Sequence, residues 1–595
     1  EVILARNPLP GVTGYVCNHL CQTRCTRNDY EQTIAIRALK RYAEEHGQVA
    51  PLVPATPTGK RVAVIGSGPS GFSAAFYLAL NGVKVHMYEA RDVIGGMMRL
   101  VPVFRLPWEV IQRDVDRILD LGVELELNRR IANRPEALLS EGYDAVYVAT
   151  GFERDTPLDI PGIAGPGVHA ALTLLDRTRR GERVNLGRKA LVIGGGDTAM
   201  DAVRTSRRLT GNPATIVYRR TRAEMPASPE ELEGALEEGN ILEELVSPVS
   251  VVRKDGQVTG LHCVRNALGE PGPDGRRRPV PIRGSDFIIP CDAVIVAVGQ
   301  SPDISFLDGS VVTLCDEGGI GIDPASGQTT APGIYAGGDV AQAGPESIIA
   351  ACADGRRAAE AICRQFGISF AQPPAHMPKL SEADILANKQ MRVRKLPQQQ
   401  PPMLPIELRE DFDLIELTFT EAQARAEGAR CLQCTSYCDK CVEVCPNRAN
   451  WTFHIEPVRW QVPTLAVQDG GLIVAGSEAF EVVQDRQILN VNDFCNACGD
   501  CTIFCVHEGQ PWFDKPRLFL NEPDFLLADH NAYRIVGDTV YRRHAGRASQ
   551  LTRQNGHLLY EDEAVQVTLA RDFQVREMRL KQPFAGAHSL RDAAE

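Results

Sequence analysis

The sequence predicts an α/β fold with two Rossmann-like nucleotide-binding domains and cysteine-rich segments near both ends. Two observations support this prediction. A buried strand, a glycine turn, a helix and a second strand follow one another over residues 60–89, and the same plan recurs from residue 188. Twelve of the 17 cysteines fall into three clusters, at residues 17–25, 431–445 and 495–505. Such clusters predict metal centres in a reducing compartment rather than a disulfide framework.

Composition limits the possible partners. The chain has 595 residues, of which 44% are hydrophobic and 24% charged, and its formal net charge is −12. This charge argues against nucleic acid or an anionic membrane as the main partner. We see no apolar run of about eighteen residues and no signal peptide, so we expect a cytoplasmic protein without a membrane span. Because residue 1 is Glu, we expect the chain to be part of a longer polypeptide.

The first glycine turn, GSGPSG, follows a predicted strand at residues 60–65 and opens a helix. Its three glycines allow a tight turn, the approach of a pyrophosphate to the backbone and close packing of helix on strand. Glu89 ends the next strand, where a carboxylate can bind ribose hydroxyls. We predict a dinucleotide here, held by Glu89 and by the residues of the turn, Gly66, Ser67, Gly68, Pro69 and Gly71.

The second turn, GGGDTA, predicts a second dinucleotide site formed by Gly194, Gly195, Gly196, Asp197 and Thr198. The strand that follows ends in Arg219 and Arg220 instead of an acidic residue. Arginine at this place can hold a 2′-phosphate, which favours NADPH over NADH. NADH stays possible, because the two arginines could instead form a solvated surface.

The stretch CNACGDCTIFC has the cysteine spacing of bacterial ferredoxins, in which three cysteines bind one cluster and the fourth binds its neighbour. The partner motif ends in Cys445-Pro446. We predict two [4Fe–4S] clusters, one on Cys434, Cys438, Cys441 and Cys505, the other on Cys445, Cys495, Cys498 and Cys501. Structural zinc is the alternative, although zinc usually takes two simple CxxC pairs.

Four clustered cysteines remain after this assignment. They are Cys17, Cys21 and Cys25 near the start, and Cys431. Because twelve cysteines make three sets of four, we predict that these four hold a third [4Fe–4S] cluster. His19 is a possible rival ligand, and its ordinary interpretation is a solvent-exposed residue or a neighbour of the ligands.

Several motifs together resemble two-dinucleotide-domain flavoproteins: both glycine turns, GGMMRLVPVFRLP at 95–107, the strand ends at Gly151 and Gly299, and YAGGD at 335–339. The chain is most similar to the glutamate synthase small subunit and the amino-terminal part of dihydropyrimidine dehydrogenase. With its carboxy-terminal ferredoxin motif, it also resembles the selenate reductase subunit family. The resemblance implies FAD at the first turn and NADPH at the second. It also implies flavin contacts from Gly96, Arg105, Gly151, Gly338, Asp339, Ser347 and Ile348, with Gly299 at the second site.

The motif order predicts seven segments. They are an amino-terminal helical Fe–S segment (1–59), the FAD domain in two parts (60–150 and 291–365), an inserted NAD(P)H domain (151–290), a linker or arm (366–430), a ferredoxin-like domain (431–525) and a small domain of unknown role (526–595).

The predicted function is electron transfer from NADPH through FAD to the clusters, and then to an acceptor site upstream in the chain or on a partner subunit. No cysteine pair adjoins the predicted flavin within residues 60–365, which disfavours a disulfide reductase. Reverse flow, in which clusters reduce NAD(P)+ through FAD, and flavin bifurcation stay open. So does a non-catalytic Fe–S scaffold. The sequence does not identify the acceptor.

Overall fold

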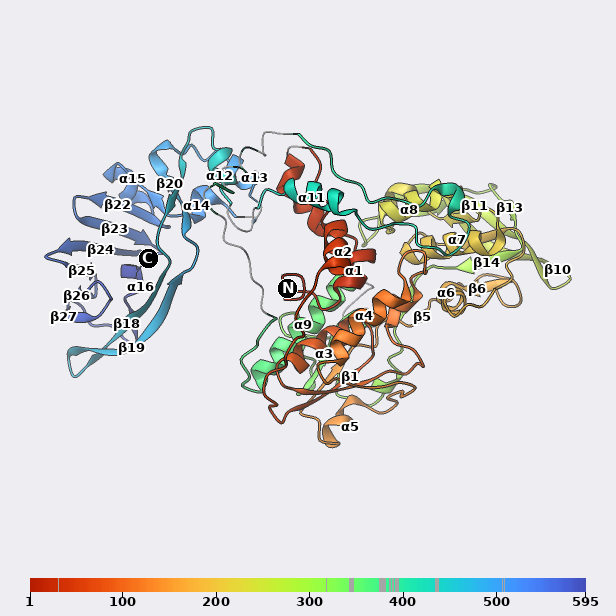
Figure 1. Ribbon diagram of the computed structural model, residues 1–595, viewed down its shortest axis with the longest axis horizontal. Coiled ribbons are helices and arrows are strands. Elements are labelled where there is room, and N and C mark those ends of the chain that lie inside the picture. The colour runs from red at the N-terminus through yellow and green to blue at the C-terminus, as the bar shows by residue number, and fades with distance from the viewer. Residues whose placement is uncertain are drawn as a thin grey trace. The chain divides into compact units, whose positions relative to one another are not determined.

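The computed structural model describes residues 1–594, except 30, 317, 342–346, 374–380, 382, 385, 386, 388, 389, 391–394, 434–437, 506 and 508. The chain divides into two units (Figure 1). The first contains Glu1–Gln22, Ile34–Pro378 and Gln398–Arg430, and the second contains Thr23–Thr33, Lys379–Pro397 and Cys431–Glu595. Among the described residues, no helix is long and apolar enough to cross a bilayer.

A parallel sheet with strand order β16-β4-β1-β2-β3 forms the centre of the first unit. Its strands are β1 (Arg61–Ile65), β2 (Lys84–Tyr88), β3 (Glu124–Glu126), β4 (Ala145–Val148) and β16 (Ile334–Ala336). Its helices are α3 (Pro69–Leu80), α4 (Trp108–Leu119), α5 (Pro135–Ser140) and α9 (Ile348–Gln365). Gly355 lets α9 lie directly against α3, because a Cβ there would be 2.2 Å from the Ser70 carbonyl oxygen.

A second parallel sheet, with order β6-β14-β7-β8-β9, comes from residues between β4 and β16 and is therefore an insertion into the first domain. Its elements are β6 (Val168–Ala170), α6 (Ala171–Arg179), β7 (Ala190–Ile193), α7 (Asp197–Thr210), β8 (Thr215–Tyr218), α8 (Pro229–Glu237), β9 (Ile241–Glu244) and β14 (Ala293–Val296). A smaller sheet adds β10 (Val246–Lys254), β11 (Gln257–Pro271), β12 (Arg277–Pro281) and β13 (Phe287–Pro290). β5 (Arg154–Asp155) pairs with β15 (Gln300–Ser301) where the chain enters and leaves the insertion. The predicted pair of Rossmann-like domains is confirmed.

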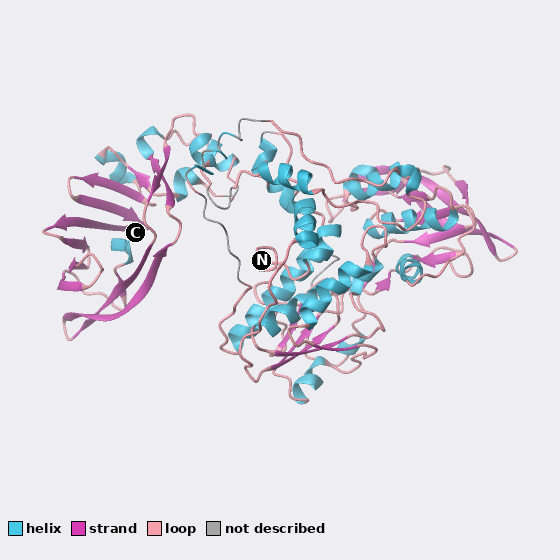
Figure 2. Ribbon diagram, viewed as in Figure 1, coloured by secondary structure: helices cyan, strands magenta, loops and turns pink. Residues whose placement is uncertain are grey.

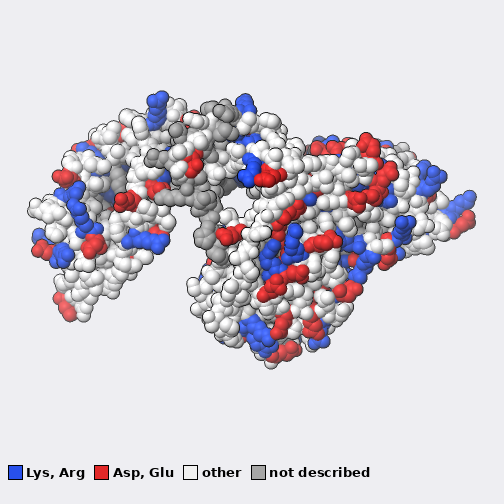
Figure 3. All heavy atoms as spheres, viewed as in Figure 1, with Lys and Arg blue, Asp and Glu red and all other residues white. Residues whose placement is uncertain are grey.

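Helices α1 (Pro10–Val16) and α2 (Ile36–His46) precede the first sheet, together with the short helices η1 (Leu20–Arg24) and η2 (Thr26–Asp29). Residues 398–430 of the predicted linker belong to the first unit. Its helix α11 (Glu421–Ala429) packs on α2, where Phe419 and Ala424 meet Ala35 and Ala38. We call residues 398–430 the arm. In the view of Figure 3, acidic side chains gather on the surface over α8.

The second unit combines short helices with a large sheet (Figure 2). The helices are α12 (Lys440–Glu443), α13 (Asp500–Ile503), α14 (Pro511–Asp514), α15 (Glu522–Leu527) and α16 (Arg591–Ala594). The nine-stranded sheet contains β17 (Asn450–His454), β20 (Arg486–Val491), β21 (Arg517–Leu518), β22 (Ala532–Val536), β23 (Thr539–His544), β24 (Arg547–Gln554), β25 (His557–Asp562), β26 (Val565–Leu569) and β27 (Val575–Leu580). A three-stranded sheet contains β18 (Val458–Gln468), β19 (Gly471–Val482) and β28 (His588–Ser589). The predicted boundary at 525/526 falls inside the nine-stranded sheet, because β21 pairs with β22.

Candidate functional site

The first glycine turn is shaped to receive a phosphate. Gly66 has a φ of +107°, and a Cβ there would be 2.4 Å from the Ala149 carbonyl oxygen. A Cβ at Gly71 would be 2.0 Å from the Gly66 carbonyl oxygen. Gly68 differs, because the nearest protein atom to its Cβ would be the Gly96 Cα at 4.0 Å. The protein itself leaves room at Gly68, as the close approach of a pyrophosphate to the backbone requires.

Glu89 closes this turn from the side of β2. Its Oε2 accepts hydrogen bonds from the Ser67 N–H (3.0 Å) and Oγ (2.6 Å), and its Oε1 accepts one from the Arg91 N–H (2.8 Å). The carboxylate is buried and held in one orientation. Oε1 accepts only one of these three bonds and has a further lone pair, so Glu89 retains capacity to accept a ribose hydroxyl.

A cavity of about 260 Å³ extends from this turn. The predicted residues that line it are Gly66, Ser67, Gly68, Pro69, Glu89, Gly96, Gly151, Gly338, Asp339, Ser347 and Ile348. The Oγ1 of Thr150 lies in its wall, is buried, and has no hydrogen-bond partner among the described residues. An unsatisfied buried hydroxyl and an open glycine cradle fit a polar, phosphate-bearing ligand such as FAD.

The cavity wall also contains charged residues that the sequence analysis did not single out: Arg91, Arg99, Arg129, Arg130, Asp155 and Asp176. Arg99 forms an ion pair with Asp176. Arg129 and Arg130 follow the end of β3 after two intervening residues. They lie next to Glu89 in space, since the Arg129 N–H donates to the Glu89 carbonyl oxygen at 2.8 Å. Their position past the end of a parallel strand could have identified them, because ligands bind beyond the carboxyl ends of such strands.

The second glycine turn repeats the geometry of the first. Gly194 has a φ of +147°, and a Cβ there would be 2.1 Å from the Ala297 carbonyl oxygen. At Gly195 a Cβ would meet the ring of Tyr218 at 2.4 Å, whereas at Gly196 the nearest atom would be 3.9 Å away. Thr198 accepts a hydrogen bond from the Gln300 side chain at 3.0 Å. The open position again lies at the second glycine of the GxG pair, at the start of α7.

The two arginines after β8 have different environments. Arg219 is exposed, and its side chain has no hydrogen bond or ion pair within the described part of the chain. Arg220 is buried, its Nε donates to the Arg277 carbonyl oxygen at 2.6 Å, and its Nη2 lies 3.4 Å from Asp274 Oδ2. Arg219 is therefore available to a ligand, whereas Arg220 anchors the hairpin between β11 and β12.

Arg105 lies outside the lining of the first cavity. Its guanidinium bonds to Asp201 Oδ1 (2.5 Å) and Glu231 Oε1 (2.6 Å), and so joins the first domain to helices α7 and α8 of the inserted domain. Burial raises the pKa of Asp201 to about 6, although Arg105 acts in the opposite direction. A flavin contact from Arg105 stays a prediction.

A second cavity, of about 190 Å³, adjoins the first. Both are lined by Met97, Leu100, Leu172, Ser347 and Ile348, and the second also by Cys17, Arg105, Asp197, Thr198 and Asp201. Ser347 caps the 18-residue helix α9 by accepting the Ala350 N–H at 3.2 Å. The amino-terminal cysteine loop, the second glycine turn and the start of α9 therefore meet at one place in the first unit.

The His19 side chain contacts α8, with its Nε2 2.9 Å from Glu230 Oε1. Its backbone N–H donates to Cys17 Sγ at 3.3 Å. Cys17 and Cys21 belong to the first unit, and Cys25 and Cys431 to the second. The four-cysteine set stays a prediction.

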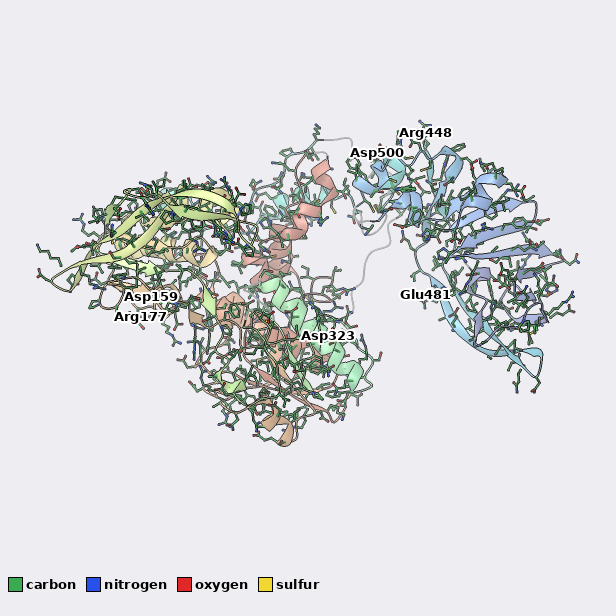
Figure 4. The ribbon with its side chains drawn as sticks, turned by 180° about the vertical axis from the view of Figure 1, so that it is seen from behind. Asp159, Arg177, Asp323, Arg448, Glu481 and Asp500 are labelled. Carbon is green, nitrogen blue, oxygen red and sulfur yellow. The ribbon has the colours of Figure 1, made fainter. Side chains whose placement is uncertain are left out.

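In the second unit, Cys445, Cys495, Cys498 and Cys501 line one pocket, together with Asn447, Asn450, Asn496, Gly499 and Trp512. These cysteines are one of the two predicted ligand sets. Backbone N–H groups point at the thiols, from Ala449 to Cys445 Sγ (3.2 Å) and from Ala497 to Cys495 Sγ (3.4 Å). Four thiols with N–H donors around them fit an iron–sulfur cluster. Figure 4 labels Arg448 and Asp500, one from each cysteine loop.

The other predicted set is described in part. Cys434 lies outside the described residues, and Cys438, Cys441 and Cys505 lie within them. Burial raises the pKa of the Cys441 thiol to about 12, and the neighbouring Cys438, Cys501 and Cys505 add to this rise. Within the described ranges, no group of three or more His, Cys, Asp or Glu side chains is placed to hold a single metal ion. The zinc alternative stays open.

Two family models match the chain. The pyridine nucleotide-disulphide oxidoreductase model matches residues 60–355, and the model for dihydropyrimidine dehydrogenase domain II, 4Fe-4S cluster, matches residues 1–50. The chain thus has the cofactor-binding fold of an NAD(P)H- and FAD-dependent oxidoreductase, preceded by a 4Fe-4S domain.

Three relatives show which oxidoreductases of this kind the chain is similar to. The NADP(+)-dependent formate dehydrogenase subunit beta of Moorella thermoacetica is 36% identical over 73% of this chain and 66% of its own length. The oxidoreductase YgfK of Escherichia coli strain K12 is 34% identical over 88% of this chain and 47% of its own length. The glutamate synthase [NADPH] small chain of the same organism is 37% identical over 60% of this chain and 80% of its own length.

The chain belongs to the family of NAD(P)H-dependent flavin and iron–sulfur oxidoreductases that includes the glutamate synthase small chain. The resemblance to this subunit and to dihydropyrimidine dehydrogenase is confirmed. The chain spans less than two thirds of the formate dehydrogenase subunit and about half of YgfK.

Proposed function

We propose that the chain is the electron-input part of a larger reductase, passing electrons from NADPH through FAD to iron–sulfur clusters. The observation that carries this proposal is the pair of adjoining cavities, whose shared wall includes Ser347 and Ile348. The first extends from the turn proposed for FAD, and the second reaches both Thr198 of the proposed NADPH turn and Cys17 of the cysteine loop. A donor and an acceptor of electrons can therefore both approach the flavin site.

The chain's own residues position the reactants. Glu89 and the open position at Gly68 would hold the ribose and pyrophosphate of FAD, and the amino terminus of α9 would face its ring. Gly196 and the amino terminus of α7 would hold the pyrophosphate of NADPH, and Arg219 its 2′-phosphate. A nicotinamide gives up two electrons together as a hydride, whereas an iron–sulfur cluster accepts one electron at a time. A bound flavin can accept the hydride and release the electrons singly, so it can connect the two. Positioning and water exclusion by the protein are sufficient for this chemistry.

We also propose three [4Fe–4S] clusters. The pocket lined by Cys445, Cys495, Cys498 and Cys501 supports one of them, and the 4Fe-4S family match at residues 1–50 supports a cluster on the amino-terminal cysteines. Cys431 as the fourth amino-terminal ligand rests on the count of cysteines alone. A cytoplasmic location and an acceptor site elsewhere in a longer chain, or on a partner subunit, belong to the same proposal.

Anaerobic stopped-flow absorbance with NADPH, and separately with NADH, tests the proposed function. We expect rapid bleaching of the flavin bands, then slower loss of the broad iron–sulfur absorbance, with NADPH the better donor. Flavin bleaching without cluster reduction would contradict forward flow and favour reverse flow or bifurcation. Absence of flavin bleaching with either nucleotide would leave only a scaffold role.

A further inference from the structure

A short segment at the start of α8, residues 227–231, is tied to the second glycine turn. The Ala227 N–H donates to the Gly195 carbonyl oxygen at 3.1 Å, and the Ser228 N–H donates to Asp197 Oδ1 at 2.8 Å. Both acceptors belong to the turn proposed to bind NADPH. A change in the position of that turn would therefore move the segment, which we call the α8 start.

The other side of the α8 start is tied to the cysteine loop. Glu230 Oε1 lies 2.9 Å from His19 Nε2, and Glu230 Oε2 lies 3.3 Å from Arg37 Nη1. His19 stands between Cys17 and Cys21 in the sequence. The neighbouring Glu231 instead contacts Arg105, which lines the second cavity beside the proposed flavin cavity. Two consecutive glutamates thus connect the inserted domain to the regions of both proposed redox centres.

The backbone of His19 acts directly on a proposed cluster ligand. Its N–H donates to Cys17 Sγ at 3.3 Å, and its φ of +39° is uncommon for a residue other than glycine. Hydrogen bonds to the sulfurs are among the features that set the reduction potential of an iron–sulfur cluster. Because the His19 side chain is fixed by Glu230, the geometry of this N–H···S bond depends on where the α8 start lies.

We propose that Glu230 is a positioning residue that couples occupancy of the second dinucleotide site to the reduction potential of the amino-terminal cluster. This inference rests on the proposed function, because both NADPH and this cluster are part of that proposal. A ligand on the turn changes the position of the α8 start, and Glu230 passes the change to His19 and to its bond with Cys17. By linkage, the oxidised and reduced forms of the cluster then bind the nucleotide with different affinities.

The test is a redox titration of the full chain, followed by electron paramagnetic resonance, with and without 2′-phospho-ADP-ribose. This probe has the phosphates of NADPH but no nicotinamide, so it takes no electrons. We expect the probe to shift the midpoint potential of one cluster and to leave the ferredoxin-type clusters unchanged. A tenfold difference in affinity between the two redox states would appear as a shift of about 59 mV for this one-electron couple.

The decisive variant is Glu230→Gln, which removes the charge but keeps the size of a side chain that is 51% exposed. We expect it to lose most of the probe-induced shift while the oxidised protein binds the probe with unchanged affinity. Glu233→Gln is the matched control, because Glu233 lies on the same helix, is 61% exposed and pairs only with Arg222 among the described residues. The control should keep the full shift. His19→Gln should also lose most of the probe-induced shift in midpoint potential, because it removes the imidazole that contacts Glu230.

Two results would overturn the inference. A shift of equal size in wild type and Glu230→Gln would exclude Glu230 as the connection, and no shift in wild type at saturating probe would exclude the coupling. The iron content separates these results from a failure of the proposed function. About eight irons per chain, instead of the twelve that three clusters require, in both the wild type and a Cys17→Ser variant would show that the amino-terminal cluster is absent.

Discussion

Arg219 and Arg220 follow β8 and have different roles, because Arg220 is buried and Arg219 is exposed. Arg220 is held by the Arg277 carbonyl oxygen and Asp274, so its hydrogen-bonding capacity serves the β11–β12 hairpin. Arg219 is exposed beside it, and the Asn266 side chain fixes its carbonyl oxygen at 2.9 Å. The exposed Arg219 side chain is therefore the one that a 2′-phosphate could contact, and its backbone is already held in place by Asn266.

We expect Arg219→Ala to weaken NADPH binding about 10- to 100-fold, because a hydrogen bond to a charged group contributes about 1.5–3 kcal/mol. NADH binding should change little, since NADH lacks the 2′-phosphate. Dissociation constants for both nucleotides, measured by fluorescence titration, check this prediction. Arg188→Ala, which removes another exposed arginine of the inserted domain, is the control. Equal weakening of NADPH and NADH would contradict the assignment.

Among the elements, the arm is the clearest example of a structure that local sequence patterns do not predict. Residues 398–430 contain few periodic apolar positions, and their order comes from distant partners. Glu427 is fully buried and accepts hydrogen bonds from the Ala35 N–H, the Gln399 N–H and Arg430 Nη1, at 2.7–2.8 Å. One carboxylate thus connects the start of α2, the start of the arm and the residue before Cys431.

We expect Glu427→Ala to destabilise the first unit by about 3–5 kcal/mol, because it removes the carboxylate of a buried ion pair and with it the acceptor of three hydrogen bonds. The arm should then become sensitive to limited proteolysis between residues 398 and 420. Glu421→Ala removes an exposed glutamate of the same helix, which pairs with Arg425 on the surface, and should change stability by less than about 1 kcal/mol. Similar proteolysis of both variants would show that Glu427 does not hold the arm.

The glycine turns and cysteine motifs could be predicted because each function requires a residue type at a fixed local spacing. Gly66 and Gly194 have positive φ values and contact a neighbouring strand, so no other residue fits there. The role of Arg220 and the contact of Arg105 with Asp201 could not be predicted in this way. Both depend on residues that are more than fifty positions away in the sequence and are brought close only by tertiary packing.

At the scale of the whole molecule, the second unit is larger than the cysteine motifs that identify it. Residues 526–595, to which the sequence assigned no role, complete the sheet that begins beside the cysteine loops. β20 pairs with β21 and β21 with β22, so strands on both sides of residue 525 share one hydrogen-bonded sheet. The core follows the same pattern, because Val462 and Leu465 of β18 pack with Tyr560, Val565 and Leu590.

We therefore expect a chain that ends at residue 525 to lose the ferredoxin-type clusters or to aggregate. Removing residues 526–595 would expose the edge of β21 and the apolar side chains of β18, and an unpaired edge of this kind favours association with other chains. Iron content, the iron–sulfur absorbance and light scattering of the purified truncated chain, compared with the full chain, provide the measurement. A truncated chain that stayed monomeric and kept all of its iron would show that the cysteine loops fold without the carboxy-terminal strands, and the predicted boundary at 525/526 would then be a true domain boundary.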